Sequence, residues 1–363
     1  MSNKINFILL VFIAVLVFVV STGCQGDFRP EARGGHSEVL VIMDSTMIDN
    51  SATYTAINHT FGAPILTMPR PEPRYDLFFR DLRTNVDMES MQRFKNVIIA
   101  APIDDDSNVA TYIRSMLAEN VREGVREGRS FYFPQENLWS RDQLVMILTS
   151  DSDESLAQKI RTNERRVMQE IRDLEMDRWH RYVYRRAEQI DLSRDILSRH
   201  GWTFRIQHDY RVGVDTTDFL TLRRYLHDND RWIWVHWIDN VEDIDNLDYE
   251  WINATRDSLN MTYMRGGSDG KFVRTDYDRP MEQRFFTRND MEVFEIRGLW
   301  RMENDLMGGP FVNYTMYDAE NKRLYLMEYG QFAPRWDQRR FIYQFEAMAR
   351  TFISDPASVV ASN

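Results

Sequence analysis

The stretch "RWIWVHWID", residues 231–239, decides the fold of the second half of the chain. Successive side chains of a strand point to opposite faces of a sheet, so Trp232 and Trp234 share one face while Ile233 and Val235 share the other. Both faces are therefore apolar. A strand of this kind is expected at the centre of a sheet that is covered on both sides.

Further strands follow it along the chain. "EVFEIRGLWRM", residues 292–302, alternates apolar residues with Glu295 and Arg297, which predicts a strand with one face on the core and one in solvent. "FVNYTMYD" (311–318) and "RLYLMEYGQF" (323–332) are joined by the turn-like "AENK", and together they predict a β-hairpin.

A closing helix is predicted over residues 337–354, because Phe341, Phe345, Met348 and Phe352 recur at helical spacing. Antiparallel strands closed by a helix describe an α+β domain, which we place at residues 201–354. Residues 355–363 are interpreted as a tail.

The first half of the chain predicts a smaller α/β or α+β domain over residues 38–150. "NVIIAAPI", residues 96–103, is continuously apolar, which is typical of a strand buried on both faces. The closely spaced prolines of "MPRPEPRYD" exclude regular helix at residues 68–76. Other strand-like runs lie at residues 38–44, 130–134 and 143–150.

Residues 151–200 are predicted to be helical, since their apolar residues recur at spacings of three, four and seven. Ser152 supplies a helix start and Gly201 a stop. We therefore expect an α+β protein of two domains, each a mixed or mainly antiparallel sheet with helices packed on it, joined by a long helix.

The beginning of the chain has the three parts of a secretory signal. A basic residue precedes a short apolar run and then small residues, so residues 1–23 are interpreted as a signal peptide that is removed. Cys24 is the only cysteine, and Ser21 to Cys24 resemble the lipobox of bacterial lipoproteins. We predict that Cys24 is lipidated and that residues 24–37 form a flexible tether.

The net charge and the absence of known motifs argue against several classes of function. The chain carries a net charge of −11, whereas nucleic-acid phosphates require a basic surface, so no nucleic-acid partner is predicted. Histidines are scattered and no cysteine pair exists, so neither a metal site nor a cofactor is predicted. The acidic stretch at 239–250 lacks EF-hand spacing, and a calcium-dependent module stays as a third hypothesis.

One region resembles a known family. "RGLWRMENDLMGGPFV" (297–312) and "FAPRWDQRR" (332–340) are similar to an uncharacterised bacterial lipoprotein family, domain of unknown function 4837. A looser likeness begins at the "VLVIMD" strand and extends to the end of the chain. The resemblance implies an envelope lipoprotein of a Gram-negative bacterium, and it implies no catalytic residue.

The loop at residues 303–310, between two predicted strands, is where such a sheet can present polar groups. Gly308 and Gly309 allow close backbone approach, and aromatic neighbours can floor a pocket. A turn that only connects the strands is the alternative. The candidate binding residues are Trp300, Arg301, Glu303, Asn304, Asp305 and Trp336.

These observations predict a non-catalytic binding or assembly protein that is anchored to a membrane by lipid and acts on another envelope protein. Gln25 follows the cysteine where an inner-membrane retention signal has Asp, which favours the outer membrane, facing the periplasm or the cell surface. The alternative is a hydrolase or other enzyme that acts on envelope material. Ligand, partner and oligomeric state stay open at this point.

Overall fold

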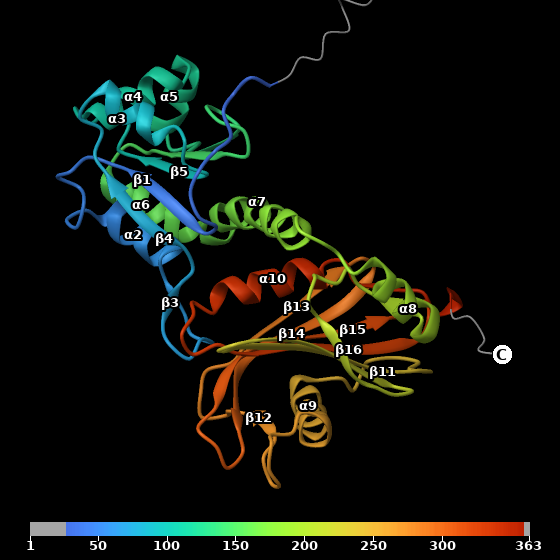
Figure 1. Cartoon of the computed structure of the whole chain (residues 1–363). Helices are drawn as coiled ribbons and strands as arrows, with labels where there is room; N and C mark the ends of the chain where they lie inside the picture. The colour runs from blue at the N-terminus through green and yellow to red at the C-terminus, as the bar shows by residue number, and fades with distance from the viewer. Residues whose placement is uncertain (1–26, 359–363) are drawn as a thin grey trace, which may run out of the picture.

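The computed structural model describes residues 27–358, which form two domains connected through α7 (Glu164–Tyr184) (Figure 1). The predicted signal peptide (1–23), Cys24 and residues 359–363 lie outside the described residues. Within 27–358, no helix combines the length and the apolar character that crossing a membrane requires.

The N-terminal domain contains a mixed five-stranded sheet in the order β4-β1-β5-β7-β6. The first four strands in this order run parallel, and β6 pairs antiparallel with β7 at the edge. The strands are β1 (Glu38–Ile42), β4 (Asp76–Arg80), β5 (Asn96–Ala100), β6 (Tyr132–Glu136) and β7 (Leu144–Leu148).

Helices cover both faces of this sheet, as the continuous apolar run of β5 predicts. One face packs on α2 (Ala52–Phe61), α6 (Asp153–Thr162) and the start of α7. The other face packs on α3 (Asn85–Met91), α4 (Asn108–Met116) and α5 (Glu119–Arg126). Parallel strands need such cover because neither of their faces is polar.

The predicted helix over residues 151–200 is divided into three. Ser152 begins α6 as predicted, its side chain accepting from Ser155 N, but Asn163 interrupts the helix and bonds back to the Lys159 carbonyl. Asparagine competes for backbone hydrogen bonds in this way, which favours helix ends. A second break, at residues 185–189, separates α7 from α8 (Ile190–His200), where Glu188 pairs with Gln207.

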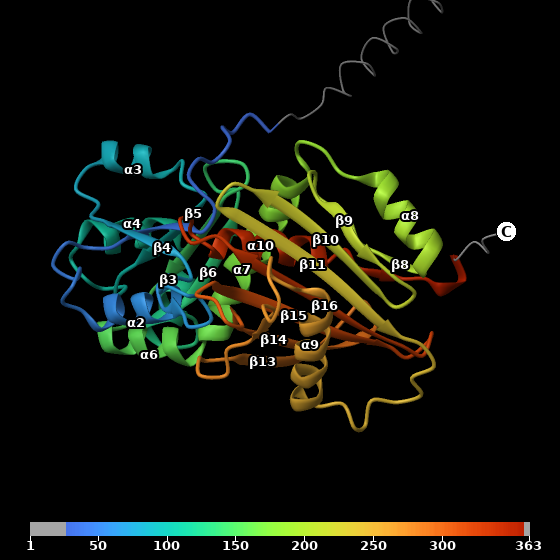
Figure 2. The ribbon, with the colours of Figure 1, turned by 60° about the horizontal axis from the view of Figure 1, so that its bottom comes forward.

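The C-terminal domain is built on an antiparallel sheet in the order β12-β14-β15-β16-β11-β10-β9, with β13 also paired to β14 (Figure 2). The central position predicted for β11 and the β15–β16 hairpin are both present. The strands are β9 (Arg211–Asp215), β10 (Phe219–Leu226), β11 (Asn229–Ile238), β12 (Val273–Thr275), β13 (Glu282–Arg288), β14 (Met291–Met302), β15 (Gly308–Asp318) and β16 (Arg323–Phe332).

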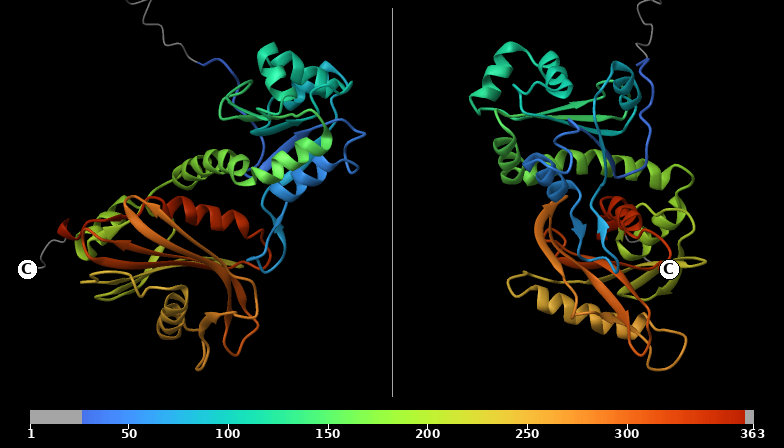
Figure 3. Two further views of the ribbon diagram at one scale, coloured as in Figure 1. Left: turned by 180° about the vertical axis from the view of Figure 1, so that it is seen from behind. Right: turned by 90° about the vertical axis from the view of Figure 1, so that its left-hand side faces the viewer.

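Two helices cover the opposite faces of this sheet (Figure 3). On one face, α10 (Arg339–Ala349) lies between the sheet and α7, and on the other lies α9 (Tyr249–Tyr263), whose N-cap is Asp248. The predicted closing helix is shorter than expected, because residues 353–354 form β17 (Ile353–Ser354), which pairs with β8 (Trp202–Thr203). The last element is a 3-10 turn (Pro356–Ser358).

The proline-rich bend makes the second connection between the domains. It folds into a small antiparallel pair, β2 (Pro64–Ile65) and β3 (Glu72–Pro73), that reaches the beginning of α10 (Figure 1). There the Glu72 carboxylate accepts the backbone N–H groups of Gln338 and Arg339, each at 2.8 Å. Glu72 thus satisfies two donors that α10 itself leaves without partners.

The prediction that one face of β14 is solvated is wrong. Glu295 is 1% exposed and the Arg297 side chain is 13% exposed, because α10 covers this face. Charged residues at alternate positions of a strand are compatible with a solvated face, and equally with a face covered by a layer that carries opposite charges. Here the covering helix α10 carries such a charge, because Glu346 lies 2.6 Å from Arg297.

Candidate ligand-binding cleft

The residues predicted from sequence as a site tie two loops together. Glu303 pairs with Arg274 at 2.9 Å, and Asp305 pairs with Lys271 at 2.6 Å. Asn304, with a positive φ of 56°, donates to the Gly270 carbonyl at 3.1 Å. Both carboxylates are therefore engaged within the protein, as in the alternative of a connecting turn.

The two predicted aromatic residues lie in different environments. Trp300 is 2% exposed within the core under α9, and its indole N–H donates to the Gln331 carbonyl at 3.1 Å. Trp336 is 44% exposed just before α10, and Arg301 is exposed as well. A side chain at Gly309 would meet the Gln331 carbonyl, so this glycine permits close strand packing.

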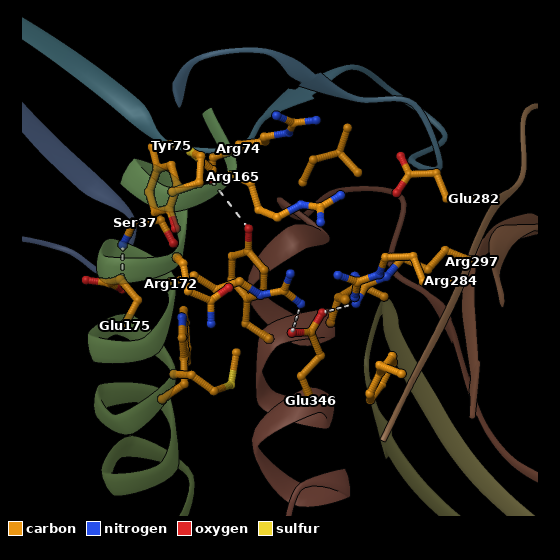
Figure 4. A pocket seen from close by; sticks show the side chains of 18 of the residues that line it. Ser37, Arg74, Tyr75, Arg165, Arg172, Glu175, Glu282, Arg284, Arg297 and Glu346 are labelled. Atoms are coloured by element: carbon orange, nitrogen blue, oxygen red, sulfur yellow. Dashed lines mark hydrogen bonds and ion pairs between the residues drawn. The ribbon is translucent and has the colours of Figure 1, made fainter. Parts of the chain in front are cut away.

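A cleft of roughly 840 Å³ opens between the two domains at a different place (Figure 4). One wall is α7 with the beginning of β1 and the proline-rich bend, and the opposite wall is α10 with β13 and β14. Pockets of this size between domains are common places for small-molecule ligands.

The α7 wall follows from helical periodicity. Arg165, Met168, Arg172 and Trp179 are separated by three, four and seven residues, so they share one side of the helix and all line the cleft. Arg165 has no hydrogen-bond or ion-pair partner within residues 27–358, although Arg74 nearby is paired with Glu164 at 3.0 Å. Within the described part of the chain, this wall therefore offers one unpaired guanidinium, that of Arg165, one helical turn from Met168.

The opposite wall, together with Arg172 of α7, carries a group of charges that we call the cleft cluster: Arg172, Arg284, Glu295, Arg297 and Glu346. Arg284 lies directly opposite Glu295 in the β13–β14 register, and Glu295 holds both Arg284 and Arg297. Glu346 lies between Arg297 and Arg172, the latter at 3.7 Å (Figure 4). These carboxylates fix the directions of the guanidinium groups.

The pKa values report the same balance of charge. Burial acts to raise the pKa of Glu346, but Arg297 and Arg172 outweigh it and hold this pKa at about 2. Burial likewise acts to lower the pKa of Arg297, while Glu346 and Glu295 raise it. Both groups are therefore charged near neutral pH.

The cleft cluster has one more arginine than carboxylate: Arg172, Arg284 and Arg297 against Glu295 and Glu346. Around the whole cleft the charges are closer to balance. The lining has five arginines and four glutamates: Arg74, Arg165, Arg172, Arg284 and Arg297 with Glu164, Glu175, Glu282 and Glu346. The surplus of cationic donors is therefore local to the cleft cluster.

Apolar side chains complete the cleft. Met168 and Met176 line it from α7 and Ile342 from α10, while Phe285, at the mouth, is 54% exposed. Methionine side chains adapt their shape to what they contact. The cleft therefore combines oriented cationic donors with a pliable apolar surface.

A buried network fixes the α7 wall to the N-terminal domain. Glu175 accepts from Ser37 N at 3.0 Å and Asn96 Nδ2 at 2.9 Å, and it pairs with Arg178 at 2.5 Å. Burial acts to raise the pKa of Glu175, but His36 and Arg178 outweigh it and hold this pKa at about 2. The position of α7, and so of its arginines, is set by these bonds.

The opposite face of the C-terminal sheet holds a second arginine–glutamate pair, which we call the sealed pair. Arg256 of α9 and Glu328 of β16 are 0% and 1% exposed, and each has further polar partners under α9. The guanidinium also lies 3.6 Å from the Phe311 ring centroid. Nothing in this pair faces solvent, so its role is in packing.

Sequence reasoning missed the cleft because its walls come from distant segments. Arg297 and Arg172 are 125 residues apart, and no local pattern joins them. The one usable signal was the pair Glu295 and Arg297 on the same face of a strand. His236, the one histidine of β11, bonds to the Asp218 carbonyl at 2.8 Å. Among the residues described, no three His, Cys, Asp or Glu side chains gather as metal ligands.

The fold and the cleft define a two-domain α+β protein with a ligand-sized space between its domains. Residues 189–351 match the family described as a domain of unknown function, DUF4837, which agrees with the resemblance drawn from the sequence. Residues 32–184 match a second domain of unknown function, DUF8532. The break between α7 and α8 lies between the two matched segments.

No curated protein matches the chain. Among solved structures, the Ran-binding protein Mog1p of Saccharomyces cerevisiae is similar with a TM-score of 0.29 and 11% identity, covering 44% of this chain and 94% of that one. A mutant of the protein Mog1 has a TM-score of 0.27 and 10% identity, covering 43% and 93%. Neither similarity bears on what this chain does.

Proposed function

We propose that the protein is a lipid-anchored envelope protein whose interdomain cleft binds a ligand with an oxyanion on an apolar body. The observation that carries this proposal is the cleft itself, in which oriented arginines lie beside half-buried Met168 and exposed Phe285. Arginine forks match the geometry of carboxylate and phosphate groups. The apolar surface suits the remainder of such a ligand.

Binding fits this cleft better than catalysis. Its two buried carboxylates, Glu346 and Glu175, have pKa values of about 2, so they hold their charge through the neutral range and are poor proton donors. The arginines they orient bind anions but do not exchange protons near neutral pH. Lipidation of Cys24 and a place at the outer membrane belong to the same proposal, and the flanking sequence supports them.

Isothermal titration calorimetry on the full chain in a nonionic detergent tests the binding. Phenyl phosphate and phenylacetate are the probes, and neutral phenylacetamide is the probe without the anion. We expect heats of binding from the two anions and none from the amide. Arg172→Gln is expected to weaken binding about 10- to 100-fold, the value of a charge-assisted hydrogen bond.

A neighbouring pair of arginines supplies the matched control. Arg165 lines the cleft, whereas Arg166 lies over the Tyr132 ring at 5.6 Å on the N-terminal domain. Arg165→Gln should weaken phenyl phosphate binding and Arg166→Gln should not. Equal affinities in wild type, Arg165→Gln and Arg172→Gln would remove the cleft from consideration. Anchoring is tested separately with Cys24→Ala. This variant should be lost from the membrane fraction and recovered in the soluble fraction.

A further inference from the structure

A second group of buried arginines lies on the other side of α10, outside the cleft. Arg224 of β10 and Arg231 of β11 are directly opposite each other in the antiparallel register, and they are 8% and 3% exposed. Like charges in this position destabilise a sheet. Two buried cations side by side therefore need an explanation.

Counter-charge is scarce around this pair. Arg231 has no ion-pair partner within residues 27–358, and its Nη1 donates to Gln344 Oε1 at 3.1 Å. Arg224 lies 3.6 Å from Asp209, which is 59% exposed. A ring contact with Phe341, at 4.5 Å from the Arg231 guanidinium, offsets part of the cost. A buried charge without a carboxylate is otherwise expensive.

Polar atoms around the pair also lack partners. Nε of both arginines, the Tyr210 hydroxyl, His208 Nδ1 and Asn229 Oδ1 are buried without a hydrogen bond among the described residues. Most of these atoms are donors or can become donors. Buried donors of this kind are rare in native proteins, and their number at one place indicates a missing acceptor.

We infer that Arg224 and Arg231 form a second binding site, for a small oxyanion such as a phosphate or carboxylate group. The oxyanion would accept from the two Nε–H groups and from the Tyr210 hydroxyl. The Arg224 side chain is 10% exposed and Asp209 beside it is 59% exposed, so the oxyanion would reach the pair next to Asp209. Asp209 is the carboxylate that it would displace as partner of Arg224.

Asp209 gives this site a distinctive test. If an oxyanion competes with Asp209 for Arg224, Asp209→Asn should tighten its binding, about three- to tenfold for a pair at the surface. If the arginines are purely structural, the same substitution leaves anion affinity unchanged. The result therefore separates a binding role from a packing role without altering either arginine.

The experiment is a titration of the full chain in nonionic detergent with sodium phosphate and with sodium acetate, at constant ionic strength, followed by melting temperature. We expect a saturable rise with at least one anion, because a ligand that binds only the folded state stabilises it. A saturable rise with phosphate but not acetate indicates a phosphoryl ligand, and a rise with acetate but not phosphate indicates a carboxylate ligand. A rise with both indicates a general oxyanion site. No saturable rise with either overturns the inference.

Variants assign the response to this site. Arg231→Gln is expected to weaken binding about 10- to 100-fold. Arg223→Gln is the matched control, since Arg223 is the exposed neighbour of Arg224 and pairs with Asp230. Arg172→Gln weakens oxyanion binding in the cleft, so the saturable response that persists in this variant belongs to Arg224 and Arg231. An unchanged affinity in Arg231→Gln would overturn the inference.

Should Arg231→Gln fail to fold, Arg231→Lys keeps the charge while removing the planar fork. It is expected to weaken anion binding while Asp209→Asn tightens it. Equal affinities in these two variants and wild type would likewise overturn the inference.

Discussion

The sealed pair and the cleft cluster place the same two residue types on opposite faces of one sheet, with opposite access to solvent. Arg256 and Glu328 are closed under α9, whereas Arg172 and Arg284 of the cleft cluster are 34% and 46% exposed. The sealed pair also has one cation for its carboxylate, while the cleft cluster has three arginines for two carboxylates.

The pKa directions express this difference. Burial raises the pKa of Glu328, and the single arginine beside it offsets only part of this rise. Two arginines, in contrast, hold the pKa of Glu346 at about 2. In the sealed pair the one positive charge is matched by one carboxylate inside the protein. In the cleft cluster the additional arginine is a donor that a ligand can use.

The largest expected effect breaks the sealed pair. Glu328→Gln leaves the Arg256 charge buried without a carboxylate, so the free energy of unfolding should fall by about 3–5 kcal/mol. Urea denaturation measures it. Glu242→Gln, which removes an exposed pair with Lys322, should cost less than about 1 kcal/mol.

Replacing both members of the sealed pair shows whether the loss of stability comes from the unpaired charge. Arg256→Met with Glu328→Leu removes both charges, so much of the stability should return. A loss in Glu328→Gln no greater than that in Glu242→Gln would contradict a structural role for the sealed pair.

A smaller effect is expected from Glu346→Gln in the cleft cluster, about 1–3 kcal/mol, because Arg297 keeps Glu295 and Arg172 is partly solvated. Added phosphate stabilises every variant whose oxyanion sites are intact, so the rise in wild type is the reference. The rise should be larger in Glu346→Gln, because the cleft cluster has lost a carboxylate, and equal to that of wild type in Glu328→Gln. Equal rises in the two variants would contradict the distinction between the two sites.

The pH dependence of stability tests the charge of Glu346. Its pKa is held below its ordinary value of 4.5, so the stability that it contributes is present above that pH and is lost as pH falls toward 2. Urea denaturation of wild type and Glu346→Gln across this range measures the difference between them, which should shrink as the pH falls. A difference that does not change with pH would contradict this role of Glu346.

The smallest effect concerns the connection between the domains. Glu72→Ala removes the carboxylate that accepts two N–H groups at the start of α10, at an expected cost of about 1 kcal/mol. Hydrogen exchange should then rise in the first turn of α10 and stay unchanged in α9. An equal rise in both helices would indicate general loosening of the domain.

The strand pattern was readable from sequence because it is local. β11 has two apolar faces and lies centrally, and Asp248 begins α9 as its charge at a helix N-terminus predicts. The match of residues 189–351 likewise follows motifs that lie in short continuous segments. Local alternation and capping are enough for such elements.

The cleft was not readable, for a physical reason. Glu295 and Arg297 look the same in sequence whether they face water or the charges of a covering helix. What decides between the two is Glu346, whose position depends on how α10 packs, and Arg172, whose position depends on α7. The predicted site in the loop at 303–310 is occupied by internal pairs, because Asp305 pairs with Lys271 and Glu303 pairs with Arg274 of β12.

Hydrogen–deuterium exchange on the full chain, with and without phenyl phosphate, tests most directly whether the open cluster binds ligand while the sealed pair only packs. The account predicts slower exchange in α7, α10 and β13, which line the cleft, and no change in α9. Unchanged exchange around the cleft, or equal protection of α9, would contradict it.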